Sequence, residues 1–491
     1  MAEPTLMQIL DAGATFCRQN RIADAEQVFR HGAARFANNS ILLNNLASIL
    51  ALQQKFDEAM TWHDRAVAAD PNDALAHANR AKTLMTLRRF DEALTSLRRV
   101  DELEPKNADA ILELGICLRR LHRDEESEKA FRRVIELAPQ KAASYAYLGQ
   151  VLWDLGKPVE SLAALRRAVE LAPHDPKIHH GFGMALLLNG DLPNGWREMD
   201  YRWQSNDYAD IASPTSAPRW DGSRLNGRSI YIQPEQGLGD TLHFIRYAAL
   251  LAKQGGRVTV GTHKPLKELV ATVPGVSEVS AEGEPLPRHD CWVGLMSLPK
   301  FLKTDLTNIP ADVPYVRADP KKVAQWKERL SREENFKVGL TWAGNPDHTR
   351  DRLRSMKLSD FAPLANAQGV TFYSLQHTAG AEQAKSPPPG MNFVDLADEL
   401  PTFSDTAAVV ESLDLMISVD TAVIHLAGAM AKPVWTLIHY SPDWRWMLER
   451  EDSPWYPTMR LFRQKVYGDW SEVVRRVAVE LANRTARGGA T

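Results

Sequence analysis

The chain has 491 residues, of which 44% are hydrophobic and 25% charged, and its formal net charge is -3 at pH 7. This length predicts about two to four globular domains, and the balanced charge excludes a basic protein that binds nucleic acid with its whole surface. Its three cysteines, Cys17, Cys117 and Cys291, lie far apart and match no metal-ligand spacing. The N-terminus has no signal-peptide pattern and no segment is apolar enough to span a membrane, so we expect a cytoplasmic protein.

A repeat occupies the first two-fifths of the sequence. Four prolines, Pro71, Pro105, Pro139 and Pro173, follow one another at equal intervals (105−71, 139−105 and 173−139). Proline cannot continue a helix, so each is expected to follow a helix end. Two series of small residues keep the same period: Ala47, Ala81, Gly115 and Gly149, and Ala59, Ala93, Ser127 and Ser161. They indicate pairs of helices that approach each other closely.

This period, with its alternation of small and large residues, resembles the tetratricopeptide repeat (TPR) family, whose repeats are about 34 residues long. The phase runs from Gly13 to Gly183, which predicts five repeats and a degenerate sixth in residues 1–205. The resemblance implies an α-solenoid whose groove holds an extended peptide or a partner protein.

Two asparagines are candidate groove residues. Asn45 and Asn79 are one repeat period apart (79−45) on the helix expected to line the groove, and an asparagine amide can hydrogen-bond a peptide backbone. The pair resembles the asparagine ladder of the O-linked N-acetylglucosamine transferases. Glu113 and Tyr147 replace asparagine in the next repeats. Two solvated asparagines on a helix face are an equally good interpretation.

The remainder is predicted to be α/β. Residues 206–228 are rich in Pro, Ser, Gly and Asp and are expected to form a linker. A first Rossmann-like lobe is predicted at 229–318, with a strand, a glycine turn and a helix over 240–255. A charged interlobe helix at 319–335 precedes a second Rossmann-like lobe at 336–465, and a C-terminal helix and tail fill 466–491. The expected fold class is therefore α + α/β.

The glycine turn after the first strand is the first candidate site. In the segment QGLGD, Gly237 and Gly239 permit a tight turn and leave room for a ligand. The helix that follows offers free N–H groups to an anion, with Asp240 at its expected N-cap. A turn with an ordinary aspartate cap is the alternative interpretation. The segment does not match the GxGxxG pattern, so a dinucleotide fingerprint is not supported.

A basic loop follows the first strand of the second lobe, within residues 342–358. It contains Gly344, Asn345, Arg350, Arg352, Arg354 and Lys357. Arginine side chains and backbone N–H groups are the partners that a diphosphate requires. A solvated basic loop is the alternative, although loops directly after core strands frequently carry function.

Two further segments contain candidate ligand-binding residues. In the first, Asp420 ends a buried strand, Thr421 opens a helix whose N-terminus can hold a phosphate, and His425 lies one turn beyond. An ordinary cap and a packed histidine are the alternative. In the second, the aromatic residues Trp444, Trp446, Trp455 and Tyr456 lie close together in the sequence. They are expected to stack on a base or sugar, or to pack between the lobes.

Together, the segments GLGD, VGLTWAGNP, SVDTAVIHLAGAMAKPVW and PDWRW resemble the heptosyltransferase-related glycosyltransferases of family 9, in the subgroup fused to TPRs. The resemblance covers nearly all of residues 229–480 and implies a GT-B arrangement of the two lobes. It implies that Asp240 is the general base, that Arg354 contacts the donor phosphates, and that Asp420, Thr421 and His425 bind the donor. Ala422 replaces a glycine of the family motif, so the donor is not expected to be the family's heptose.

From this resemblance we expect a metal-independent, inverting glycosyltransferase that uses a nucleotide-sugar donor and no cofactor. No Asp-x-Asp metal motif lies at a strand end. Gly237, Gly239, Gly344 and Asn345 are expected to join the donor-binding residues. The TPR array suggests a protein or peptide acceptor, for which a flagellin-like protein is one candidate. A lipid or polysaccharide acceptor, or an inactive TPR scaffold, are the alternatives.

Overall fold

The computed structural model describes residues 3–205, 215–377 and 379–488. The chain divides into two compact units, Met1–Pro173 and His174–Thr491. The array expected from the sequence extends to residue 205, so its last helices fall within the second unit. Part of the expected linker, residues 206–214, and the end of the expected tail, residues 489–491, lie outside the described residues. No described helix is long and apolar enough to cross a membrane.

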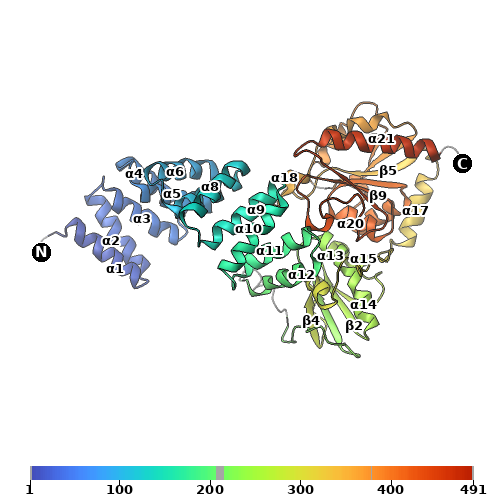
Figure 1. Ribbon diagram of the computed structural model, residues 1–491, viewed down its shortest axis with the longest axis horizontal. Coiled ribbons are helices and arrows are strands. Elements are labelled where there is room, and N and C mark those ends of the chain that lie inside the picture. The colour runs from blue at the N-terminus through green and yellow to red at the C-terminus, as the bar shows by residue number, and fades with distance from the viewer. Residues whose placement is uncertain (1–2, 206–214, 378, 489–491) are drawn as a thin grey trace. The chain divides into compact units, whose positions relative to one another are not determined.

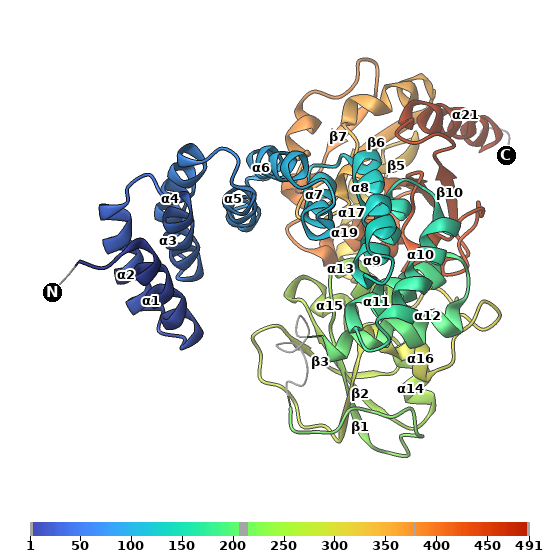
Figure 2. The same ribbon diagram turned by 60° about the vertical axis from the view of Figure 1, so that its left-hand side comes forward.

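Helical pairs with a constant period build the first unit (Figures 1 and 2). The first helices of the pairs begin at equal intervals (40−6, 74−40, 108−74 and 142−108) and have 13 residues each: α1 (Leu6–Arg18), α3 (Ser40–Leu52), α5 (Ala74–Thr86), α7 (Ala108–Arg120) and α9 (Ala142–Asp154). The second helices have 14 residues each: α2 (Ile22–Arg35), α4 (Phe56–Ala69), α6 (Phe90–Leu103), α8 (Asp124–Leu137) and α10 (Pro158–Leu171). The predicted period is confirmed.

The small residues of the repeat explain how the two helices of a pair touch. A Cβ atom added to Gly115 would lie 2.5 Å from the Phe131 ring, and one added to Gly149 would lie 2.5 Å from Leu165 Cγ. Ser127 Oγ donates a hydrogen bond of 2.8 Å to the Gly115 carbonyl. Ser161 makes the same contact with Gly149, at 2.7 Å. Both series of small residues therefore lie at the contact between paired helices.

The second unit begins with a sixth helical pair, α11 (Pro176–Leu188) and α12 (Leu192–Met199), which start one repeat period after α9 and α10 (176−142 and 192−158). The short 3₁₀ helix η1 (Asp200–Gln204) follows. Two parallel sheets then form the two lobes. The first has the order β3-β2-β1-β4, with β1 (Ser229–Gln233), β2 (Arg257–Thr262), β3 (Val276–Ala281) and β4 (Cys291–Gly294).

The second sheet has six parallel strands in the order β10-β9-β8-β5-β6-β7. They are β5 (Phe336–Thr341), β6 (Val370–Ser374), β7 (Phe393–Asp395), β8 (Leu415–Val419), β9 (Val434–Ile438) and β10 (Met459–Arg463). Figure 1 shows α21 (Trp470–Gly488) on one side of this sheet and α20 (Ala422–Ala429) on the other. Side chains of α21, including Val473, Val477 and Leu481, complete the core on its side.

The structure corrects several expected elements. The expected helix over 240–255 is three segments, α13 (Leu238–Phe244), a 3₁₀ turn at Ile245–Tyr247, and α14 (Ala248–Lys253). After the basic loop the chain forms a 3₁₀ helix, Leu358–Asn366, rather than an α-helix, because Pro363 lies inside it. Edge strands β7 and β10 were not expected. The remaining helices are α15 (Lys267–Val270), α16 (Leu298–Phe301), α17 (Pro320–Leu330), α18 (Asp351–Arg354) and α19 (Phe403–Ser412).

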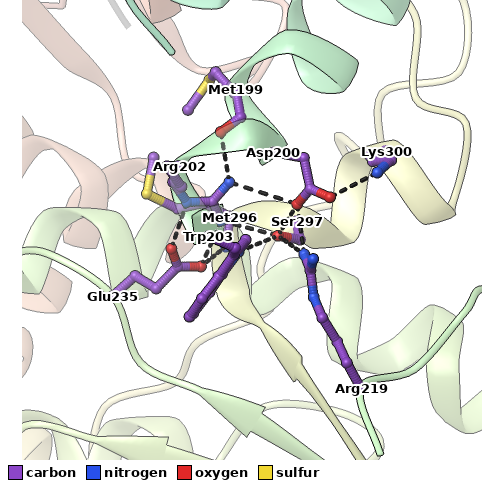
Figure 3. A network of polar contacts seen from close by, with 9 residues as sticks. All are labelled: Met199, Asp200, Arg202, Trp203, Arg219, Glu235, Met296, Ser297 and Lys300. Atoms are coloured by element: carbon purple, nitrogen blue, oxygen red, sulfur yellow. Dashed lines mark hydrogen bonds and ion pairs between the residues drawn. The ribbon is translucent and has the colours of Figure 1, made fainter. Parts of the chain in front are cut away.

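A buried polar network joins η1 to the first lobe (Figure 3). Arg202, 1% exposed, donates from Nε and Nη2 to the two carboxylate oxygens of Glu235, at 2.7 and 2.8 Å. Glu235 follows β1 and also accepts the backbone N–H of Met296, at 2.9 Å. Ser297 Oγ donates to Asp200, which Lys300 also contacts, at 2.6 Å. The network fixes the segment that leads into the glycine turn.

Candidate functional site

The strand order of the second lobe locates its ligand-binding edge. Reading outward from β5, one half of the sheet continues through β6 and β7 and the other through β8, β9 and β10. Ligands of such sheets bind at the carboxyl ends of the strands where the order reverses, here β5 and β8. The basic loop follows β5, Asp420 follows β8, and the segment from His439 follows β9. Three of the predicted segments therefore lie at one edge.

The first lobe contributes the glycine turn through a close contact between α13 and α20. A Cβ atom added to Gly239 would lie 3.0 Å from His425 Cδ2 and 3.5 Å from Ala422 Cα. Gly239 thus permits two helices of different lobes to approach each other. Ala422, which replaces the family's glycine, lies at this contact.

Asp240 lies at this contact but not at the predicted N-cap. The N-cap of α13 is Gly237, and Asp240 is the third helical residue, N3. Its Oδ2 accepts a hydrogen bond of 3.0 Å from the Gly237 backbone N–H. The expected cap is wrong by three positions because the chain turns earlier, at Gln236, whose φ is 58°. Asp240 retains 17% side-chain exposure.

Arg445 binds Asp240 across the two lobes. One guanidinium nitrogen of Arg445 donates to Asp240 Oδ1, and another donates to Asp443 Oδ1 at 3.0 Å. The guanidinium carbon lies 4.4 Å from the centre of the Trp444 ring. Burial disfavours its charge, but Asp443 and Asp240 hold the pKa of Arg445 above its ordinary value. Arg445 is a site residue that the sequence analysis missed.

Asp420 is buried beside this arginine. Its Oδ2 accepts a hydrogen bond of 2.8 Å from Trp446 Nε1. Burial and the neighbouring Asp443 raise the pKa of Asp420, while Arg354 and Arg445 oppose the rise. Asp420 is therefore held by an aromatic donor and lies within electrostatic range of two arginines from different loops.

His425 belongs to a buried chain of polar groups that links the lobes. The hydroxyl of Tyr456 lies 2.9 Å from Nδ1 of His425 and 3.2 Å from Nδ1 of His243. Burial, followed by Arg445, lowers the pKa of His425 well below 6.5. Burial and Arg246 do the same for His243. Both imidazoles are neutral at pH 7 and hold the lobes together through one tyrosine.

The basic loop positions Arg354 by local contacts. Arg354 Nε donates to Asp351 Oδ1 at 3.0 Å, and Asp351 Oδ2 accepts from Ser355 Oγ at 2.8 Å. Ser355 Oγ in turn accepts the Gly344 N–H, at 2.8 Å. A Cβ atom on residue 344 would lie 2.6 Å from Arg354 Nη2, so glycine is needed there. Arg354 also lowers the pKa of both Asp420 and His425 by its charge, so the loop lies within electrostatic range of the start of α20.

The other predicted donor residues lie at the rim of this cluster. Thr421 is the N-cap residue of α20, and its hydroxyl is 3.3 Å from Ser418 Oγ. The carbonyl of the exposed Asn345 side chain accepts the N–H of Asp347 at 3.0 Å, which closes a turn. Gly237 is exposed at the start of α13. The structure thus brings Asp240, Arg354, Asp420, Thr421 and His425 to one region.

The aromatic residues of the fourth segment pack against protein. Trp444, Trp446, Trp455 and Tyr456 are each at most 1% exposed. Trp444 contacts Trp196 of α12 edge to face, with ring centroids 5.2 Å apart. Trp446 stacks on His425, with centroids 5.5 Å apart. Packing is the correct interpretation of these side chains, because their faces are covered and offer no surface to a base or sugar.

Two more residues of this edge, Arg463 and His439, were not found from the sequence, and Arg350 of the predicted basic loop makes a further contact there. Arg350 Nη2 donates to Ser441 Oγ at 2.6 Å, joining the loops after β5 and β9. Arg463 of β10 donates to the carbonyls of Trp446 and, at 2.9 Å, Met447. These hydrogen bonds hold the backbone of the loop that carries Arg445. His439 follows β9, and burial and Arg350 lower its pKa well below 6.5. The signal for His439 was its position directly after a core strand, whereas Arg463 ends β10, which was not predicted.

The groove candidates, Asn45 and Asn79, belong to the first unit, and Asn79 forms a side-chain hydrogen bond there. Asn45 is half-buried on α3, and Asn79 is half-buried on α5. Asn79 Nδ2 donates a hydrogen bond of 3.2 Å to Asn44 Oδ1 of the preceding repeat. Asn44, not Asn45, therefore forms the amide contact between these repeats.

Family models agree with both parts of the predicted architecture. Two tetratricopeptide repeat models match residues 84–150, and 10–74, 125–176 and 147–194, respectively. The model of glycosyltransferase family 9 (heptosyltransferase) matches residues 359–467. This match includes Asp420, Thr421, His425 and Arg445, while Asp240 and Arg354 lie before it. The predicted resemblance to a TPR-fused, heptosyltransferase-like glycosyltransferase is confirmed.

A curated relative is Protein FlbA of Caulobacter vibrioides (strain ATCC 19089 / CIP 103742 / CB 15), with 28% identity over 336 residues. The alignment covers 61% of this chain and 54% of the relative, so the chain spans about half the length of FlbA. Among solved structures, MamA 41-end from Desulfovibrio magneticus RS-1 has 19% identity and a TM-score of 0.32, covering 34% of this chain and 93% of that one. YrrB, described as a TPR protein with an unusual peptide-binding site, has 18% identity and a TM-score of 0.32, covering 36% and 91%.

Proposed function

We propose that this protein is a glycosyltransferase that moves a sugar from a nucleotide-sugar donor to a hydroxyl acceptor. The observation that supports it is the meeting of four separate segments, represented by Asp240, Arg354, Asp420 and Arg445, where α13 contacts α20 at the carboxyl edge of the second sheet. Two arginines and the half-buried start of α20 suit a diphosphate leaving group. A carboxylate from the opposite lobe suits an acceptor hydroxyl.

In this proposal Asp240 removes the proton of the acceptor hydroxyl as its oxygen attacks the anomeric carbon. The bond to the diphosphate breaks, and Arg354 with the N-terminus of α20 stabilises the charge that develops on it. Attack from the face opposite the leaving group inverts the anomeric centre. The positive charge that a metal supplies in other transferases comes here from arginine side chains, so the reaction is proposed to need no metal.

We propose further that the acceptor is a protein held by the repeat array. Asn45 and Asn79 lie on equivalent turns of α3 and α5, where amides can hold an extended backbone. A flagellin-like protein is one candidate. The boundary for a test is Pro173, because Arg202 pairs with Glu235 inside the second unit and a cut at residue 205 would remove this pair.

The experiment measures release of nucleoside diphosphate from a panel of nucleotide-sugars, with cell extract as the source of acceptor. Asp240→Asn is expected to lower turnover about 10²–10⁴-fold, while Asp290→Asn, an exposed aspartate of the same lobe that accepts from Ser229, is the matched control. Deleting residues 1–173 is expected to spare donor hydrolysis and to remove transfer to protein. Normal turnover in Asp240→Asn contradicts the base. Transfer by the truncated chain contradicts the groove as the acceptor site.

A further inference from the structure

Arg445 is a buried cation with carboxylates on several sides. Its guanidinium contacts Asp240 of the first lobe and Asp443 of its own loop, and Asp420 also raises its pKa. The side chain is 9% exposed and lies next to the rings of Trp444 and Phe244, whose centroids are 4.4 and 5.6 Å from the guanidinium carbon. The aromatic contacts confine the guanidinium to this region.

Both carboxylate oxygens of Asp240 already have a partner. Oδ2 accepts the Gly237 N–H at 3.0 Å, and Oδ1 accepts from Arg445. A hydrogen bond from a charged guanidinium is stronger than one from a neutral backbone N–H, so Arg445 is the stronger of the two partners of Asp240. The contact to Gly237 is part of the helix start, whereas the contact to Arg445 comes from the other lobe. Arg445 is therefore the partner whose departure would open Asp240 Oδ1 to an acceptor hydroxyl without disturbing the start of α13.

Arg445 also lies near the place where a diphosphate would bind. Both Arg445 and Arg354 oppose the rise in the pKa of Asp420, and both help to lower the pKa of His425. The geometry agrees for Arg445, because the next residue, Trp446, donates from Nε1 to Asp420 Oδ2 at 2.8 Å, and Asp420 directly precedes Thr421, the N-cap residue of α20. An anion at the N-terminus of α20 would attract both, and phosphate oxygens accept from guanidinium groups as carboxylates do.

We propose, on the basis of the proposed function, that Arg445 couples donor binding to the base by exchanging partners. In the free protein Arg445 holds Asp240. When a nucleotide-sugar binds, the guanidinium turns to the diphosphate and releases Asp240 Oδ1 to the acceptor hydroxyl. Asp240 therefore becomes available as a base only when a donor is bound. The proposal implies an ordered reaction in which the donor binds before the acceptor.

This exchange makes a prediction that a purely structural role does not make. If Asp240 and the diphosphate compete for Arg445, loss of the Asp240 charge frees the arginine and tightens nucleotide binding. Coupling free energies between sites are reciprocal and are commonly worth about 5–150-fold in affinity. Asparagine keeps the helix start intact, because its amide oxygen can accept the Gly237 N–H.

The test is isothermal calorimetry of the full chain with UDP, GDP, ADP and CDP as probes. Asp240→Asn is expected to bind its preferred nucleoside diphosphate about tenfold more tightly than the unmodified chain, and Asp290→Asn is expected to bind with unchanged affinity. In the Arg445→Met background the added Asp240→Asn change is expected to have no effect. If Arg445→Met does not fold, Arg445→Lys replaces it, with a smaller gain expected, since lysine forms a single contact.

The outcomes separate this inference from the proposed function. If no nucleoside diphosphate binds the unmodified chain, the donor site fails and the exchange fails with it. If one binds but Asp240→Asn changes nothing, the exchange is overturned while the donor site stands. A gain of the same size in the Arg445→Met background also overturns the exchange, because it would reflect general repulsion by Asp240.

Discussion

Contacts in the repeat array are short in sequence and recur, whereas contacts at the candidate site are long and occur once. Ser127 reaches Gly115, 12 residues away, and Ser161 reaches Gly149 over the same interval. Arg445 reaches Asp240 over 205 residues. The fold of the array is therefore specified within each repeat, and the same contact recurs at the equivalent position of the next repeat. The site depends on the correct packing of two lobes, and its contacts, such as the ion pair of Arg445 with Asp240, do not recur elsewhere among the described residues as the array contacts do.

The largest expected difference between the units concerns buried charge. Glu235→Gln should lower the free energy of unfolding of the second unit by about 3 kcal/mol, because the buried Arg202 would lose the carboxylate that two of its nitrogens contact, while Asp200 is more distant, at 3.7 Å. Glu102→Gln in the array, whose pair with Arg99 is largely exposed, is the matched control and should leave unfolding unchanged. Denaturant unfolding followed by tryptophan fluorescence measures this, since 11 of the 13 tryptophans (all but Trp62 and Trp153) belong to the second unit. Equal effects of the two changes would contradict the contrast.

Acid should also weaken the second unit. Burial lowers the pKa of His243, His425 and His439 well below 6.5. The unfolded chain therefore binds more protons than the folded chain below about pH 6.5, and stability falls as the pH decreases from there. Each such histidine contributes a slope of up to about 1.4 kcal/mol per pH unit. The free energy of unfolding measured between pH 7 and 5 should fall less steeply in His439→Asn, and an unchanged slope would contradict the neutral state of His439.

The array offers a rescue experiment that its repetition makes possible. Gly115→Ala should destabilise the first unit by about 1–3 kcal/mol, because the added Cβ would overlap the Phe131 ring. The equivalent positions one repeat earlier are Ala81 and Leu97 (115−81 and 131−97). Adding Phe131→Leu to Gly115→Ala should therefore restore much of the loss in thermal unfolding followed by circular dichroism. Failure of the rescue would show that neighbouring repeats do not share one packing rule.

The smallest expected effect concerns the serine contacts of the array. Ser161→Ala should cost about 1 kcal/mol, because the Gly149 carbonyl would lose a buried donor. Alanine occupies the same position in the second and third repeats, at Ala59 and Ala93, so the backbone itself tolerates it. A loss above about 3 kcal/mol, measured by chemical denaturation, would exceed a single buried hydrogen bond and would point to a wider role of the serine.

The sequence predicted the repeat array more completely than the second unit. The helix starts of the array repeat with the period that the prolines indicated. In the second unit most strands were predicted from their apolar runs, but β7 is short and β10 alternates with arginine, which concealed both. The expected helix over 240–255 is interrupted because Ile245–Tyr247 forms a 3₁₀ turn, which no glycine or proline announces.

The sequence predicted the residues of the candidate site better than the contacts between them. Asp240, Arg354, Asp420 and His425 follow strands or open helices, so motif and strand position identified them. The ion pair of Arg445 with Asp240 depends on how the two lobes pack. Arg445 itself was overlooked because it lies in a segment rich in tryptophan, where the aromatic residues were the more prominent signal. Similarly, Arg202 lies in the degenerate last repeat, where nothing in the sequence indicates Glu235 as its partner.

The most direct test of the proposed function is calorimetric binding of UDP, GDP, ADP, CMP and CDP to the full chain and to Arg354→Ala. Arg460→Ala, at the opposite end of the same sheet, is the control. The account predicts that one nucleotide binds selectively, that Arg354→Ala weakens it at least about tenfold through loss of a charged phosphate contact, and that Arg460→Ala leaves it unchanged. Binding of none, or equal binding by Arg354→Ala, would contradict a donor site at the start of α20 and would favour a scaffold that acts through its repeats.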